Sequence, residues 1–417
     1  MILFVLIVIS CFWGERLKAG VHYYTFILFY SVCHFFYFVS KIYLLEQDLD
    51  NNEITVFYQA LILYVSIISS YLILSYLNRK KYEVVDIHLE FKNKKLILSI
   101  FAFFYILGVC LYIVKNGISF SDDYNSRIEQ NAGGGVAIIL MYSYVPFILI
   151  LYNYFSNKKG LYASLFFAIT FGIIYYFLIG GSRNLLAAGV FAIIYMAIIK
   201  KHLSILKVII FGVLGGVLLL SMEIFRYSNS LDDVFEYFNS GSFKNLSFIF
   251  ESFSPMFAVL NINNAIESNM VGIQGLKTFF NEFGILVPRF LWPDKPLNVY
   301  NSGYFYTSEI LKLNTNLTMS PTLLGSFIIM FGQGYYWFLG IVTGFIIYYF
   351  DYILRRGSNQ FLKMSFLSSI GYLFFWVRDG FEVYCYVVIK FLIAIFLARI
   401  LYSILISIIP MKSFNVN

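Results

Sequence analysis

Residues 54–77 of the chain read ITVFYQALILYVSIISSYLILSYL and contain no charged side chain. As a helix, a stretch of this length crosses the roughly 30 Å hydrocarbon core of a bilayer. Residues 46–53 before it are acidic and lack lysine and arginine, whereas Arg79, Lys80 and Lys81 follow it. Because basic residues collect on the cytoplasmic side, the stretch predicts a membrane-spanning helix that ends in the cytoplasm.

The composition extends this prediction to the whole chain. Of its 417 residues, 60% are hydrophobic and 13% are charged, and the mean hydropathy is +0.75. So few polar residues cannot cover a soluble globule of this size, so we expect an all-α polytopic membrane protein. The net charge of +7 falls mainly in predicted cytoplasmic loops, where topology and anionic lipid explain it without nucleic acid.

Similar apolar runs recur along the chain and predict about eleven transmembrane helices. We place them at 1–13, 21–45, 54–77, 96–114, 136–155, 161–179, 185–199, 208–226, 335–354, 361–377 and 383–409. The opening run has no basic residues before it and no cleavage site of small residues after it, so we interpret it as a short span and not as a signal peptide.

Basic clusters fall in alternate loops of this scheme and orient it. They are Arg16 with Lys18, Arg79 to Lys81 with Lys92, Lys94 and Lys95, Lys158 with Lys159, Lys200 with Lys201 and Lys207, and Arg355 with Arg356. The amino terminus is therefore predicted outside and the carboxyl terminus in the cytoplasm. Three regions follow: an eight-span region at 1–226, a large periplasmic loop with half-buried helices at 227–334, and a three-span region at 335–417.

The stretch from Pro321 to Leu354 is apolar and long for one span. A hairpin of two spans or one long tilted span would each account for it. We prefer a span at 335–354 preceded by a half-buried helix, since Ser320 as N-cap and Pro321 at the first helical position would start such a helix well.

Cysteine and histidine indicate neither disulfides nor a metal site on the outer face. The cysteines all lie in predicted spans: Cys11, Cys33, Cys110 and Cys385. The histidines lie in the second span or in cytoplasmic loops: His22, His34, His88 and His202. We expect free thiols, no metal and no cofactor.

The predicted outer face instead carries arginine beside short polar motifs. The candidates are Arg127 after Tyr124-Asn-Ser, Arg183 after Gly180-Gly-Ser, Arg226 near Glu223, Arg289 within Pro288-Arg-Phe-Leu-Trp-Pro-Asp-Lys-Pro296, and Arg378 before Asp379. Guanidinium suits bidentate contact with phosphate, so these arginines together suggest an anionic ligand.

Several of these residues also have a structural interpretation. Arg226 with Glu223 can be an ion pair at a span end, Arg378 with Asp379 a local turn pair, and Glu251 a solvated loop residue. Arg183 in a short turn is harder to explain without a ligand. Arg289 is the strongest candidate, because prolines and a tryptophan hold its segment rigid together with Asp294 and Lys295.

Three motifs in order resemble the Wzy-type O-antigen or oligosaccharide repeat-unit polymerases. They are Gly180-Gly-Ser-Arg183, Pro288 to Pro296, and Ser320-Pro-Thr-Leu-Leu-Gly325 followed by Phe331-Gly332. The resemblance implies a GT-C-like glycosyltransferase in the bacterial inner membrane that joins repeat units carried on undecaprenyl diphosphate at the periplasmic face. It implies a lipid-linked glycan donor and acceptor as partners, with a chain-length regulator in the membrane as a further candidate.

The chemistry of such a transfer assigns roles to the candidates. Negative charge grows on the leaving diphosphate, so cations must already be in place, and we assign Arg183 and Arg289 to the diphosphates. Arg127, Arg226, Arg378 and Lys295 are further diphosphate-binding candidates. The acceptor hydroxyl must lose a proton, for which Glu251 is the predicted base, with Asp294 behind it.

Other classes of protein remain open at this point. The related O-antigen ligases share the architecture, although the absence of a histidine from the outer loops counts against a ligase. A flippase or transporter of lipid-linked sugars would need charges along its spans and paired repeats, which the sequence lacks. A membrane scaffold would leave the outer arginines dispensable.

Overall fold

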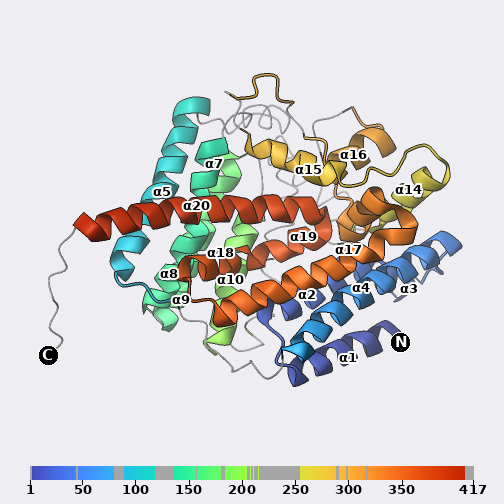
Figure 1. The fold of residues 1–417 in the computed structure, drawn as a ribbon, viewed down its shortest axis with the longest axis horizontal. Coiled ribbons are helices and arrows are strands. Elements are labelled where there is room, and N and C mark those ends of the chain that lie inside the picture. The colour runs from blue at the N-terminus through green and yellow to red at the C-terminus, as the bar shows by residue number, and fades with distance from the viewer. Residues whose placement is uncertain are drawn as a thin grey trace, which may run out of the picture. The chain divides into compact units, whose positions relative to one another are not determined.

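The computed structural model describes residues 2–43, 46–78, 89–117, 135–155, 157–179, 184–203, 254–287, 291–296, 299–314 and 318–408, with 207, 210 and 215 as isolated positions. Across these ranges the regular structure is helical and no strand occurs, as Figure 1 shows. The contacts divide the chain into two compact units. The first comprises 1–86, 213–356 and 372–386, and the second comprises 87–212, 357–371 and 387–417.

The first unit contains most of the helices that position the candidate site. They are α1 (Ile2–Arg16), α2 (Val21–Tyr30), the π-helix η1 (Ser31–Phe35), α3 (Phe36–Tyr43), α4 (Asn51–Leu77), α14 (Met256–Glu267), α15 (Lys277–Phe283), η4 (Gly284–Leu286), α16 (Ser302–Phe305), η5 (Tyr306–Ile310), α17 (Thr322–Arg356), α19 (Leu373–Asp379) and the first turns of α20 (Phe381–Ile408).

Helices α4 and α17 pack closely in this unit because α17 presents glycine to α4. A Cβ at Gly344 would lie 2.3 Å from the Ile67 carbonyl oxygen, and one at Gly340 would lie 2.7 Å from Leu63 Cδ1. Membrane helices lack a hydrophobic driving force between them and rely on such small-residue contacts for close packing. The spacing of four residues between the two glycines puts both on one face of α17.

The second unit is a helical bundle. Its helices are α5 (Lys94–Asn116), α7 (Gly135–Met141), α8 (Tyr144–Phe155), α9 (Lys158–Leu178), α10 (Asn184–Ile199), α18 (Gln360–Ser369) and the later turns of α20. Gly172 of α9 lies against Leu186 of α10. Lys390 is buried in this unit, and its Nζ lies 4.9 Å from the ring centroid of Tyr142, which compensates part of its charge.

Among the residues that the structure describes, seven helical segments are long and apolar enough to cross a membrane. They are Val21–Tyr43, Asn51–Leu77, Lys94–Asn116, Gly135–Phe155, Lys158–Leu178, Thr322–Arg356 and Phe381–Ile408. Each coincides with a span expected from the sequence. Helices α1 and α10 coincide with two more expected spans but are shorter, and the expected span 208–226 falls almost wholly outside the described residues. The total of about eleven spans stays a prediction.

Two of the expected spans differ in detail. The expected span 361–377 is interrupted, because α18 ends at Ser369, a 3-10 turn (η6, Ile370–Tyr372) follows, and α19 begins at Leu373. The apolar stretch after Ser320 forms two successive helical parts, together called α17, with a kink between them.

The start of α17 corrects the predicted cap. The helix begins at Thr322, whose Oγ1 accepts a hydrogen bond from the Gly325 amide at 3.1 Å, so Thr322 takes the capping role expected of Ser320. The first part of the helix is buried within the protein. A break at Gly332 (φ 71°, ψ 176°) then separates it from residues 333–356, which are long enough to span a bilayer alone.

The π-helix η1 is held by a residue from the middle of the chain. Ser254 Oγ donates to the Cys33 carbonyl at 2.7 Å and accepts from the Tyr37 amide at 3.2 Å. A π-turn displaces the regular backbone bonds, so these two groups need partners outside the helix. Ser254 supplies both and ties the start of the segment before α14 to the second span.

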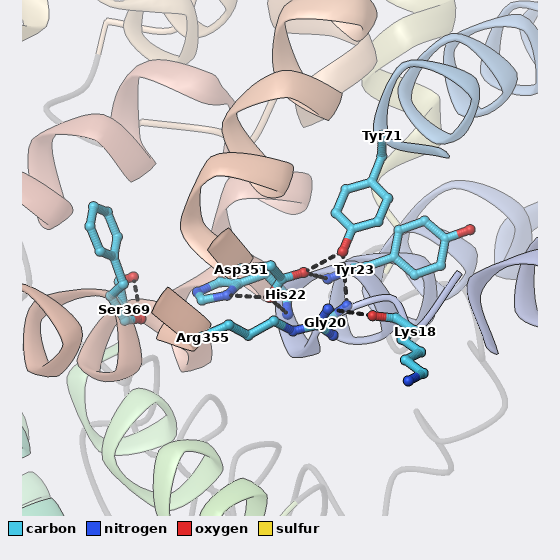
Figure 2. Close-up of polar contacts among 9 residues, drawn as sticks. Lys18, Gly20, His22, Tyr23, Tyr71, Asp351, Arg355 and Ser369 are labelled. Atoms are coloured by element: carbon cyan, nitrogen blue, oxygen red, sulfur yellow. Dashed lines mark hydrogen bonds and ion pairs between the residues drawn. The ribbon is translucent and has the colours of Figure 1, made fainter. Parts of the chain in front are cut away.

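A buried carboxylate fixes the other end of α2. Asp351 of α17 accepts hydrogen bonds from the amides of His22 (2.9 Å) and Tyr23 (3.2 Å), from Tyr71 Oη (2.9 Å), and contacts His22 Nδ1 at 3.0 Å. Figure 2 shows these side chains converging on Asp351. We call these residues together with Gly20 the Asp351 cluster. It caps the amino terminus of α2 from another helix and satisfies amides that α2 cannot satisfy itself.

The close approach of Asp351 explains the glycine before α2. A Cβ at Gly20 would lie 2.0 Å from Asp351 Cγ, so a larger residue would displace the carboxylate. The Gly20 amide in turn donates to Tyr71 Oη at 2.8 Å. One turn along α17, Arg355 donates to the Lys18 carbonyl, so the turn between α1 and α2 is attached to α17 at two points.

Candidate functional site

The candidate site is built around the turn between α19 and α20. Arg378 Nη1 donates to Asp379 Oδ1 at 2.7 Å, and the two side chains are 22% and 16% exposed. Ser320 Oγ donates to the same Asp379 oxygen at 2.6 Å. We call Ser320, Arg378 and Asp379 the Arg378 turn. It joins the Ser320-Pro321 motif to the Arg378-Asp379 pair, which are far apart in the sequence.

Gly380 makes this turn possible. Its φ is 115°, which L-residues with side chains rarely adopt, and a Cβ there would lie 3.2 Å from the Ser326 side chain. The chain can therefore reverse directly from α19 into α20 and bring the Arg378 turn against α17.

A second polar group lies immediately beside the turn. Glu382, in the first turn of α20, is buried and accepts from the Ser302 amide at 3.0 Å and from Ser326 Oγ at 3.2 Å. It thus caps α16 from another helix, as Asp351 caps α2. A buried carboxylate requires such donors. Without them, the transfer of its charge from water into the protein would be unfavourable by an amount on the order of several kcal/mol.

A further buried carboxylate belongs to the same group. Glu282 of α15 accepts from Asn301 Nδ2 at 2.7 Å, and Thr278 Oγ1 lies 3.4 Å from Ser302 Oγ. Adjacent residues of one loop therefore donate to two different carboxylates. We call this group the Glu382 cluster: Thr278, Glu282, Asn301, Ser302, Ser326 and Glu382.

Local hydrogen bonds hold the short helix α16 in place. Asn301 Oδ1 caps it by accepting from the Tyr304 amide at 2.8 Å, and Thr307 Oγ1 accepts from the Met319 amide at 2.8 Å. Burial raises the pKa of Tyr300, and Glu309 adds to this effect, so the phenol stays protonated. These contacts make the Glu382 cluster a preorganised polar site on helices.

Part of the proline-rich motif is also described. Lys295 Nζ donates to the Val287 carbonyl at 2.9 Å, and the Lys295 amide donates to the Trp292 carbonyl at 3.2 Å, which closes a turn. Asp294 in this turn is exposed. Residues 291–296 thus form a local turn, whereas Arg289 lies outside the described residues.

The other expected site residues divide clearly. Arg378, Asp294 and Lys295 are described, whereas Arg127, Arg183, Arg226, Arg289 and Glu251 lie outside the described residues. The ion pair of Arg378 with Asp379 is the local contact that the sequence left open as an alternative to ligand binding. The described cysteines are free, as expected: Cys11, Cys33, Cys110 and Cys385.

Sequence reasoning assigned no role to Glu382 or Ser302. A signal for Glu382 existed, because it is an acidic residue at the start of a long apolar run, where burial demands partners. Ser302 gave no comparable signal. Among the residues that the structure describes, no group of three or more His, Cys, Asp or Glu side chains could hold a metal ion.

These features define a multi-pass helical membrane protein with a group of buried and partly exposed polar side chains around the start of α20. Over residues 1–413 the chain matches the family described as WzyE protein, O-antigen assembly polymerase. The chain therefore belongs to the WzyE family of O-antigen assembly polymerases, and the resemblance seen in its motifs is confirmed. No solved structure matches the fold.

Proposed function

We propose that this chain polymerises undecaprenyl-diphosphate-linked oligosaccharide repeat units by glycosyl transfer at the periplasmic face of the bacterial inner membrane. The family supports a polymerase of surface polysaccharide. The apolar helices support a multi-pass membrane location, where a lipid-linked substrate would reside.

The single observation that carries the site is the Arg378 turn. There the hydroxyl of the Ser320 motif and the guanidinium of Arg378 meet on one carboxylate, Asp379. The Ser320 motif is one of the three that resemble the family. A cation thus lies beside a family motif on the predicted outer side, as binding of a diphosphate requires.

In the proposed reaction an acceptor hydroxyl attacks the anomeric carbon of the donor glycan. The new C–O bond forms as the bond to the diphosphate breaks, and the diphosphate leaves with the electron pair. Arg183 and Arg289 would hold the diphosphates, with Arg127, Arg226, Arg378 and Lys295 as supporting cations. The proton of the acceptor would pass to Glu251, with Asp294 as the second candidate base.

The buried carboxylates have a different part in this proposal. Glu382 and Glu282 accept from the loop that begins α16 and are almost fully enclosed, so they position the site. They are not assigned to proton transfer.

Removal of the leading arginines tests the proposal. A charge-assisted contact in a water-poor site contributes about 2–4 kcal/mol, or about 10²–10³ in rate. Arg289→Ala and Arg183→Ala should therefore leave surface glycan with a single repeat unit while membrane levels of the protein stay normal. Lysine should rescue only partly, because it supplies charge without the planar fork.

Arg399→Ala is the matched control, since Arg399 is an exposed arginine on α20 with no proposed role. Glycan chain length on gels and protein level on blots give the readout. Normal long chains in both test variants would remove these arginines from the mechanism. Loss of all glycan attachment would indicate a ligase, and accumulation of repeat units on the cytoplasmic leaflet would indicate a flippase.

A further inference from the structure

Helix α15 has the reverse of the polarity expected for a helix in an aqueous loop. Two of its polar residues, Thr278 and Glu282, are 0% and 2% exposed, whereas Phe280 between them is 63% exposed. Residues four apart share a face of a helix, so Thr278 and Glu282 form the inner face. Both residues belong to the Glu382 cluster described above, where they contact Asn301 and Ser302.

The opposite face of α15 exposes large apolar side chains, with the exposed Lys277 at its border. Leu276 and Phe280 are exposed and lie one turn apart, with the Phe280 amide bonded to the Leu276 carbonyl. Gly284 is the next position along this line, and the ring of Trp292 lies over it, 3.4 Å from where a Cβ would be. We call Leu276, Phe280, Gly284 and Trp292 the α15 apolar face.

The attachment of this segment to α17 indicates the level of the α15 apolar face relative to the membrane. The Gln274 amide donates to the Ile329 carbonyl at 2.9 Å, just before the break at Gly332, and Ile273 packs against Gly332 itself. Residues 333–356 beyond the break are long enough to span a bilayer alone. The segment that leads into α15 is therefore tied to the end of a span, at the level of the membrane interface.

Cations border the α15 apolar face. Lys277 is exposed, with its Nζ 5.4 Å from the ring centroid of Tyr300, and the Lys295 ammonium bonds to the Val287 carbonyl. An exposed tryptophan beside lysines is typical of the boundary between acyl chains and headgroups. This arrangement is complementary to phosphate headgroups above an apolar layer.

We infer that the α15 apolar face lies in the bilayer and contacts the acyl chains of lipid in the leaflet on the side of Gly332. The segment around α15 is then an interfacial element and not a soluble loop. Its buried polar face carries the Glu382 cluster at the membrane surface, where a lipid-linked ligand would be reached without leaving the bilayer. The inference depends on the membrane location of the chain and not on the proposed reaction.

Spin labelling of the full chain tests this contact directly. Phe280→Cys is labelled with a nitroxide in a background whose native cysteines are replaced by alanine, and the protein is reconstituted in phospholipid liposomes free of polyprenyl lipid. Collision with oxygen, which partitions into acyl chains, is compared with collision with a water-soluble nickel chelate. Ile73→Cys, exposed on the α4 span, is the lipid standard, and Asn264→Cys, exposed on α14, is the aqueous standard.

The inference predicts that the label at Phe280 loses most of the nickel effect seen at Asn264 and gives the oxygen-to-nickel ratio seen at Ile73. Leu276→Cys, on the same face, gives a second measurement if Phe280→Cys does not fold. Nickel access equal to that at Asn264 would overturn the inference. Exclusion of both reagents, with spin–spin broadening, would overturn it in favour of a second copy of the chain.

Discussion

The Asp351 cluster and the Glu382 cluster share one structural feature but differ in their proposed roles. In each, a buried carboxylate caps the amino terminus of a helix that is distant in sequence. Asp351 gathers two amides, a tyrosine hydroxyl and a histidine ring on one carboxylate. Glu382 accepts from one amide and one serine hydroxyl, and a second buried carboxylate, Glu282, bonds to the residue beside its donor.

The difference separates a structural contact from a candidate functional one. The Asp351 cluster joins helices α2, α4 and α17, and its Asp351 and His22 side chains are almost fully buried, as expected of a structural attachment. The Glu382 cluster adjoins the Arg378 turn, whose side chains reach solvent. Buried groups that hold partly exposed charged groups in place are the usual arrangement of a binding site.

The membrane topology determines whether the Asp351 cluster and the Glu382 cluster face opposite sides of the membrane. A reporter fusion at each position gives either a cytoplasmic or a periplasmic signal, so this test has the largest effect. Reporter fusions at Asn157 and Ser204 should give cytoplasmic signals, and fusions at Asn125 and Asn298 should give periplasmic signals, because the basic clusters alternate between loops. Paired alkaline phosphatase and green fluorescent protein fusions measure this. An inverted result at Asn298 would remove the site assignment, since the proposed reaction takes place outside.

The next largest effect concerns stability. Asp351→Ala should leave the amides of α2 and the Tyr71 hydroxyl without their acceptor, and breaking a buried polar pair destabilises by about 3–5 kcal/mol. We expect a large fall in thermal stability in detergent, with the activity of the surviving folded protein retained. Tyr349→Ala, an exposed position on the same helix, is the control. Loss of activity at unchanged stability would show that the Asp351 cluster serves the reaction.

The sequence predicted the spans well because their signal is local. A charge-free stretch such as 54–77 needs only its own composition to form a membrane helix. A separate helix before the span at 335–354 was expected, and the break at Gly332 agrees with it, but the contacts at the break and the π-helix η1 were not predicted, because they depend on distant partners. The kink of α17 at Gly332 is accompanied by the Gln274 amide on the Ile329 carbonyl, and the π-helix η1 by Ser254.

The site could be predicted only in part, for the same reason. The pair Arg378 with Asp379 is visible in sequence as adjacent opposite charges. That Ser320 would bind Asp379 instead of capping its own helix depends on a contact across 59 positions. Glu382 and Asp351 act on helices 80 and 329 positions away, so their roles could not be inferred without a fold.

A smaller effect is expected at the Arg378 turn itself. Arg378→Ala should lower the polymerisation rate by about tenfold, or about 1.4 kcal/mol, because its guanidinium is partly engaged by Asp379 and partly exposed. Rates are measured with purified protein and lipid-linked repeat units. Asp379→Asn, which keeps an acceptor for Ser320, is the companion variant and separates the guanidinium from its anchor. A loss of rate as large as that expected for Arg289→Ala would make Arg378 a leading ligand of the diphosphate. An unchanged rate would leave the pair of Arg378 and Asp379 with a structural role.

The smallest effect is expected for Ser320→Ala, which removes one hydroxyl from a partly buried carboxylate. A hydrogen bond to a charged group contributes about 1.5–3 kcal/mol when buried, and partial exposure of Asp379 reduces this to about 1 kcal/mol. We expect a small loss of thermal stability and a fall in rate of less than about fivefold. Ser268→Ala is the control, since the Ser268 hydroxyl donates to the Asn264 and Ala265 carbonyls at the end of α14. If Ser320→Ala abolished polymerisation while the protein stayed folded, the hydroxyl would have to contact substrate. The Arg378 turn would then be the reaction centre, with a catalytic role that the structural Asp351 cluster does not have.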